Sequence, residues 1–136
     1  MTVWRQHLEP FGPKEAGVMI RDAELTPVSL CRGGFFPAKS RRARREALDE
    51  NRKAIDEAWE LGVPIVVLVC GAVPGMPLAD ARRQIAEGIA ELLDHAKAAQ
   101  VLLSIEPLHP MYAADRSAIN TLKQANDIVE ALKSPW

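Results

Sequence analysis

The chain has 136 residues, of which 48% are hydrophobic and 26% are charged, a composition typical of a soluble globular domain. Its formal net charge of -1 provides neither the basic excess of a nucleic-acid-binding protein nor the acidic excess of a disordered one. The first residues contain no apolar signal core, and no apolar run approaches the ~20 residues of a membrane span. We therefore expect a cytoplasmic protein that contacts neither membrane nor nucleic acid.

The first third of the chain predicts a strand, a short helix and a second strand. Residues 3–5 are expected to be the end of a first strand, and a loop rich in proline and glycine follows. Across residues 14–23, apolar side chains recur at helical spacing and predict a short amphipathic helix. Residues 28–31 predict a compact strand. The paired glycines at 33–34 then predict a loop that either lets the backbone approach a ligand or is simply flexible.

A long helix is expected from the capping residue Ser40 to about Leu61, where Gly62 ends it. Its first turn carries four arginines, whose charge opposes the helix dipole. A bound phosphate or nucleic acid would compensate this charge, but no aromatic platform for bases is interleaved. We favour a solvated face on which these arginines pair with the acidic side chains that follow, which are Glu46, Asp49 and Glu50.

The second half of the chain repeats the alternation of strand and helix. Residues 63–70 are the strongest strand candidate, and an amphipathic helix is predicted over 78–99. A strand at 101–105 follows, and Ser117 or Asp115 is expected to cap a last helix. This rhythm is typical of βα units and predicts an α/β protein with a parallel sheet. The two cysteines, which lack CxxC spacing, are expected to be reduced and buried at strand ends.

Glu106 is the first candidate functional residue because it directly follows the buried strand at 101–105. Pro107 cannot donate a hydrogen bond to a sheet, so the strand should end where the acid lies. Ligands bind at the carboxyl ends of parallel strands, which would place the carboxylate beside a substrate or metal. The alternative is a glutamate that caps a helix or forms a salt bridge in a turn.

Three segments together resemble the sugar phosphate isomerase/epimerase family of xylose isomerase-like TIM barrels. They are Ser-Leu-Cys-Arg-Gly-Gly-Phe-Phe-Pro at 29–37, Val-Leu-Val-Cys-Gly at 67–71 and Ile-Glu-Pro-Leu-His-Pro-Met-Tyr at 105–112. The similarity covers nearly the whole chain. It implies that residues 1–136 form a single partial (β/α)8 TIM-barrel domain that contains about strands two to five with their helices.

The resemblance also implies a site and a chemistry. In this family a glutamate in a Glu-Pro-Leu context binds a divalent metal, such as Mn, Mg, Co or Zn, and takes part in proton transfer on a small sugar or sugar phosphate. Glu106 matches that glutamate. His109, three residues later, is a candidate to orient a substrate hydroxyl or line the mouth, with a purely structural loop histidine as the alternative. Arg32 and Trp4, at other predicted strand ends, are candidate substrate-lining residues.

The chain departs from the family pattern in two respects. A TIM barrel typically needs ~250 residues, and the other metal ligands of the family, an Asp, a His and a second Glu, come from later strands that have no counterpart here. Ketose 3-epimerases of the family often carry another glutamate six residues after the first, where this chain has Tyr112. Two alternatives to an isomerase therefore stay open: a non-catalytic half-barrel used for interaction or assembly, and a relative of endonuclease IV-like DNA repair enzymes. Because half a barrel leaves two strand edges open, the free chain is expected to form a homo-oligomer, to aggregate or to remain loosely packed.

Overall fold

A computed structural model of the chain describes all 136 residues and is built on one parallel sheet of four strands. The strands are β1 (Thr2–Trp4), β2 (Ser29–Gly34), β3 (Ile65–Val69) and β4 (Leu102–Ile105). Their order in the sheet is the order in the chain, and every neighbouring pair is parallel. The α/β class and the parallel sheet predicted from the sequence are confirmed.

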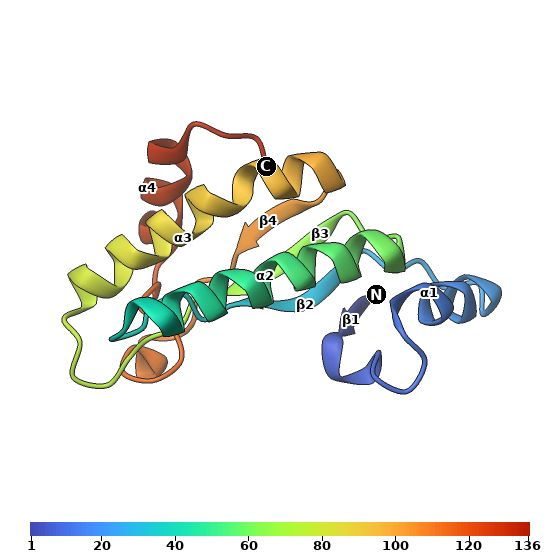
Figure 1. Ribbon diagram of the computed structural model, residues 1–136, viewed down its shortest axis with the longest axis horizontal. Helices are drawn as coiled ribbons and strands as arrows, with labels where there is room; N and C mark the ends of the chain where they lie inside the picture. The colour runs from blue at the N-terminus through green and yellow to red at the C-terminus, as the bar shows by residue number, and fades with distance from the viewer.

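Four helices connect and follow the strands, with α2 and α3 lying side by side across the sheet (Figure 1). The helices are α1 (Pro13–Asp22), α2 (Arg41–Leu61), α3 (Leu78–Ala99) and α4 (Leu122–Leu132), and short 3-10 turns occupy η1 (Arg5–His7) and η2 (Pro110–Tyr112). None of these helices is both long and apolar enough to cross a membrane.

The hydrophobic core lies between the helices and one face of the sheet. Leu30, Val66 and Leu68 of the strands are fully buried against apolar side chains of α2 and α3. Because side chains alternate along a strand, the neighbours of these residues point to the opposite face. On that face Trp4 and Leu102 remain 45% and 39% exposed. The sheet is therefore covered on one face and open on the other.

The ends of the helices follow from local residue chemistry. Ser40 caps α2 as predicted, since its hydroxyl accepts a hydrogen bond from the Ala43 N–H at 3.1 Å. Gly62 ends α2 in the left-handed conformation with a φ of 81°. The prediction for α4 was wrong: Thr121 caps it, and Ser117 is instead buried in the preceding turn, where its hydroxyl bonds the backbone of Ile119.

Strand β2 is longer than predicted and includes the two glycines. Cys31 and Arg32 consequently lie inside the strand rather than at its end. The glycines are needed there for close packing, because a Cβ on Gly33 would approach Asn51 Oδ1 to 2.7 Å. Gly34 has a φ of 110°, which other residues rarely adopt, and a side chain on it would collide with the Val69 carbonyl.

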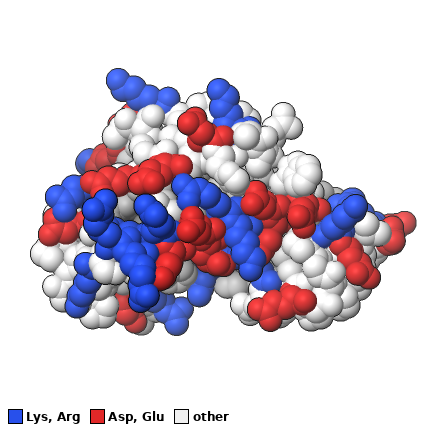
Figure 2. All heavy atoms as spheres, viewed as in Figure 1, with Lys and Arg blue, Asp and Glu red and all other residues white.

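The basic first turn of α2 forms fewer ion pairs than predicted. Arg42 pairs with Glu46 at 3.6 Å, whereas Asp49 pairs with Arg52 and Glu50 with Arg5. Figure 2 shows basic and acidic side chains interspersed on this face of the molecule. The face is a solvated one as expected, but Arg41, Arg44 and Arg45 have no carboxylate partner within 4.0 Å.

Candidate functional site

Glu106 lies at the carboxyl end of β4, on the open face of the sheet. Its backbone N–H donates to the Leu68 carbonyl at 3.0 Å, which holds the residue beside the end of β3. Leu103 and Ile105 pack toward the core, so by alternation the Glu106 side chain points to the other face. The side chain is exposed there. The local sequence produces this placement because Pro107 cannot continue the strand.

The negative charge of Glu106 contributes to raising the thiol pKa of both cysteines of the chain. Burial, and secondly the negative charge of Glu106, raises the pKa of the Cys70 thiol to about 12. Burial and then Glu106 also raise the pKa of the Cys31 thiol, against a smaller opposing effect of Arg32. Both cysteines are reduced and buried, as the sequence predicted. Glu106 therefore lies within electrostatic reach of Cys31 in β2 and of Cys70 directly after β3.

Backbone hydrogen bonds join the loops that follow the strands into one rim. The Phe35 and Phe36 N–H groups donate to the Val69 and Cys70 carbonyls at 2.9 and 3.0 Å. Farther along the rim, the Ala118 N–H donates to the Gly71 carbonyl at 2.9 Å. Together with the Glu106 bond, these contacts hold the loops after β2, β3 and β4 at the same edge of the sheet. We refer to this edge as the carboxyl rim.

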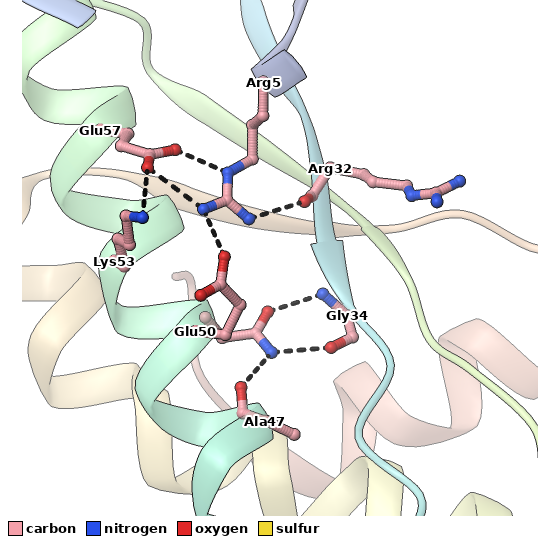
Figure 3. A network of polar contacts seen from close by, with 8 residues as sticks. Arg5, Arg32, Gly34, Ala47, Glu50, Lys53 and Glu57 are labelled. Carbon is pink, nitrogen blue, oxygen red and sulfur yellow. Dashed lines mark hydrogen bonds and ion pairs between the residues drawn. The ribbon is translucent and has the colours of Figure 1, made fainter. Parts of the chain in front are cut away.

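Asn51 of α2 fixes the part of the rim that β2 forms. Its side chain accepts from the Gly34 N–H at 2.6 Å and donates to the Gly34 carbonyl at 2.7 Å and the Ala47 carbonyl at 2.8 Å (Figure 3). The residue is buried. Sequence reasoning missed this role, although Asn51 stands among apolar residues at helical spacing. A single amide in an apolar stripe was the signal, since a buried amide needs hydrogen-bond partners.

A second polar link, also missed from the sequence, joins the segment after β1 to α2. The Arg5 guanidinium bonds Glu57 at 2.6 Å and Glu50 at 2.7 Å, and it reaches the Arg32 carbonyl at 3.4 Å (Figure 3). Glu57 also pairs with Lys53 at 3.8 Å. Nothing in the local sequence indicates a contact between residues about fifty positions apart. This network fixes the position of β1 relative to α2.

The structure places Arg32 and Trp4 near the open face but in different surroundings. The Arg32 side chain points away from Arg5 and α2 (Figure 3), and its guanidinium lies 4.8 Å from the centroid of the exposed Phe35 ring. Trp4 pairs with Cys31 in the sheet register, and the indole is on the open face. Both remain candidate substrate-lining residues by position.

His109 has a local structural role that the sequence left open. It caps the short turn η2, where its Nδ1 accepts from the Met111 N–H at 3.2 Å, and its side chain is exposed. No hydrogen bond or ion pair joins His109 to Glu106. The proposed substrate contact of His109 therefore stays a prediction.

The residues at the rim do not by themselves fit a divalent metal. No three side chains among the histidines, cysteines, aspartates and glutamates lie close enough together to hold an ion. Such ions take several oxygen ligands, most of them from carboxylates and carbonyls. Glu106 is thus a single carboxylate on an open face rather than a complete metal centre.

Comparison with known proteins reveals the relatives of this fold. A family model described as xylose isomerase-like TIM barrel matches residues 3–136. A solved structure, protein SMc04130 from Sinorhizobium meliloti 1021, is 52% identical, with a TM-score of 0.91 over 98% of this chain and 49% of that chain. The IolI protein with a bound zinc atom (19% identity, TM-score 0.78) covers 98% of this chain and 49% of its own. No curated protein matches the chain.

The solved relatives include sugar epimerases and are longer than this chain. A D-psicose 3-epimerase solved in the presence of D-fructose has a TM-score of 0.77 at 14% identity, over 98% of this chain and 50% of that one. At that identity the likeness shows the fold alone. The present chain spans about half the length of the solved structures it matches. Its four strands and four helices therefore correspond to half of a barrel.

Proposed function

The chain belongs to the xylose isomerase-like TIM barrel family, and from this premise we propose that it forms half of a sugar isomerase or epimerase. The observation that carries the proposal is the position of Glu106 at the carboxyl end of β4, with its side chain on the open face. In a closed barrel that face is the interior, and the carboxyl rim is where active sites lie. The sugar epimerases among the solved structures support a small sugar as substrate. A sugar phosphate is the second candidate.

The chemistry that suits Glu106 is proton transfer at a carbon next to a carbonyl. A carboxylate on the rim takes the proton and an enediolate forms. Delivery of a proton to the opposite face of the same carbon, by a second acid group, then gives an epimer, and delivery to the neighbouring carbon gives an isomer. General acid–base catalysis of this kind contributes about 10²–10⁴-fold to a rate. Trp4 and Arg32 would line the sugar, the first through its indole face and the second through its guanidinium donors. His109 would orient a hydroxyl at the mouth.

A zinc atom such as the one bound in the IolI structure does not fit these residues alone. We propose that Glu106 is one ligand of a divalent-metal site whose remaining ligands lie outside these 136 residues. The fold is consistent with this, because the chain spans half of its solved relatives. No step of the proton transfer described above depends on that ion being held by this chain.

The proposed function is tested by completing the barrel around this chain and assaying the product for proton transfer. We would insert the chain into SMc04130 in place of the 49% of that protein to which it is 52% identical. Deuterium incorporation from D2O into a panel of ketoses and their phosphates, followed by proton NMR, reports the proton transfer directly. We expect exchange on at least one sugar, and expect Glu106→Gln to slow it by about 10²–10⁴-fold. Glu60→Gln, at an exposed position of α2, is the matched control and should leave the rate unchanged.

Two results would count against this function. A completed barrel that folds but exchanges no sugar, with Mn²⁺ or Zn²⁺ added, would favour the non-catalytic half-barrel. Exchange that is equally fast in the Glu106→Gln barrel would show that Glu106 does not move the proton.

A further inference from the structure

The start of α2 and the middle of α3 enclose a cavity of about 260 Å³ between the two helices. Its charged lining consists of Arg41, Arg44 and Arg45 of α2 and of Glu87 and Glu91 of α3. Further strands and helices of this chain precede α2 and follow α3, so neither edge of the sheet takes part in forming the cavity. We call this space the α2–α3 cavity.

The charges on the two helices face the cavity as two separate stripes. Residues three and four apart lie on one face of a helix, which places Arg41, Arg44 and Arg45 together on α2. The same spacing places Glu87 and Glu91 together on α3. Figure 2 shows basic side chains over the start of α2 and acidic side chains over the adjoining part of α3. The cavity therefore has one positive and one negative side.

The two sides do not form the ion pairs that their charges would allow. No guanidinium of the positive side lies within 4.0 Å of a carboxylate, and Glu87 pairs instead with Arg83 of its own helix at 3.9 Å. Phe36, from the loop after β2, is buried at the floor of the cavity. Its ring lies so close to α3 that a Cβ on Gly88 would approach it to 2.5 Å. Three guanidinium groups thus face an open space beside two carboxylates that they do not reach.

We propose that the α2–α3 cavity binds a small phosphate monoester that also carries hydroxyl groups. Guanidinium groups donate to phosphate oxygens in a planar fork geometry, and these charge-assisted hydrogen bonds are among the strong ones. A phosphate would also offset the positive charge that opposes the dipole at the start of α2. Ionised carboxylates only accept hydrogen bonds, so Glu87 and Glu91 would receive the hydroxyl donors of the ligand.

The size and the mixed charge of the cavity favour a small ligand over a macromolecule. Pockets for drug-sized ligands measure about 300–1,000 Å³, and this cavity is slightly smaller. Nucleic acid would need a basic surface that follows several phosphates, whereas here Glu87 and Glu91 lie directly beside the arginines and would repel a second phosphate. Bases also stack on exposed aromatic rings, and Phe36 in this cavity is buried.

The site is separate from Glu106 and does not rest on the proposed function. Glu106 lies on the open face of the sheet, whereas α2 and α3 cover the other face. Glycerol 3-phosphate is a suitable probe for this reason. It carries a phosphate and two hydroxyl groups but no carbonyl, so it cannot undergo the proton transfer proposed for Glu106.

Isothermal titration calorimetry of the purified chain with glycerol 3-phosphate tests the site. We expect saturable binding of one molecule per chain, weaker binding of inorganic phosphate, and none of glycerol. Arg44→Gln and Arg45→Gln should each weaken glycerol 3-phosphate binding by about tenfold or more, because each removes a hydrogen bond between charged groups.

Arg42→Gln is the matched control for these two variants. It removes the same charge from the same turn of α2, but the Arg42 side chain is 88% exposed, pairs with Glu46 and lies outside the cavity. Binding by this variant should stay within about twofold of the wild type. An equal loss in Arg42→Gln and Arg44→Gln would show that net charge alone attracts the phosphate, and would overturn the site.

The double variant Glu87→Gln, Glu91→Gln tests the negative side of the cavity. Loss of two negative charges should strengthen the binding of inorganic phosphate. Loss of the two carboxylate acceptors should at the same time reduce the preference for glycerol 3-phosphate over inorganic phosphate. An unchanged preference would overturn the proposed hydroxyl contacts.

Two further measurements keep the site distinguishable from the proposed function and from misfolding. Glu106→Gln should leave glycerol 3-phosphate binding unchanged, and a loss of binding in this variant would overturn the α2–α3 site by placing the ligand on the open face. The same titrations on the completed barrel cover a chain that packs loosely by itself. The absence of saturable binding to a folded completed barrel would overturn the site, whether or not that barrel exchanges protons on a sugar.

Discussion

Asn51 is the side chain on which the end of β2 depends most directly. Its amide satisfies both backbone groups of Gly34 and the carbonyl of Ala47. Asn51→Ala would leave the Gly34 N–H and carbonyl buried without partners, and each such group costs about 1–3 kcal/mol. We expect the free energy of unfolding to fall by about 2–4 kcal/mol in urea titrations. Asn126→Ala, at an exposed position of α4, is the control, and an equal effect of both variants would contradict this role.

The Cys31 thiol reports the position of Glu106 without requiring any activity. Burial and, second to it, the Glu106 charge raise the pKa of Cys31, because both disfavour the thiolate. Glu106→Gln removes the negative charge, so the pKa of Cys31 should fall toward its ordinary value. The measurement is a pH titration of thiolate absorbance at 240 nm in a Cys70→Ala background. Glu60→Gln is the control, and an unchanged Cys31 titration in Glu106→Gln would place Glu106 elsewhere.

Helix α2 carries an unfavourable charge arrangement that the fold tolerates. Arg41, in its first turn, has no ion-pair partner, and a positive charge there opposes the helix dipole. Arg41→Glu should raise the free energy of unfolding by about 0.3–1 kcal/mol at low ionic strength. The same comparison in 1 M salt should show almost no gain, because screening shortens the range of the charge to roughly 3 Å. A gain that persists in salt would mean that the dipole is not its cause.

On the scale of the whole molecule, the chain by itself should be a poor catalyst. We expect little or no turnover of common aldoses and ketoses by the purified 136-residue chain, even with Mn²⁺, because its rim offers one candidate ligand and no three-residue metal site. Robust turnover that disappears in Glu106→Gln would contradict this and show that the site is complete without other segments.

The sequence by itself determined the elements and their order, since local patterns specify them. Period-two and period-3.6 patterns predicted four strands and the long helices, and Ser40 and Gly62 marked both ends of α2, because caps act within one helical turn. The Glu-Pro pair correctly ended β4 at Ile105. The start of α4 was missed because Ser117, Thr121 and Asp115 are all competent caps, and only packing decides among them.

Only the tertiary structure decided which distant residues meet. The pairing of Gly33 and Gly34 with β3 extended β2 beyond its predicted end, where Asn51 also bonds Gly34. The pairs of Arg5 with Glu50 and Glu57 replaced the expected pairing of Glu50 within α2. These contacts join residues 17 to 52 positions apart, so no local pattern encodes them. The same holds for the open face: the sequence predicted apolar strands, and the arrangement of four strands with helices on one side determined which of their side chains face solvent.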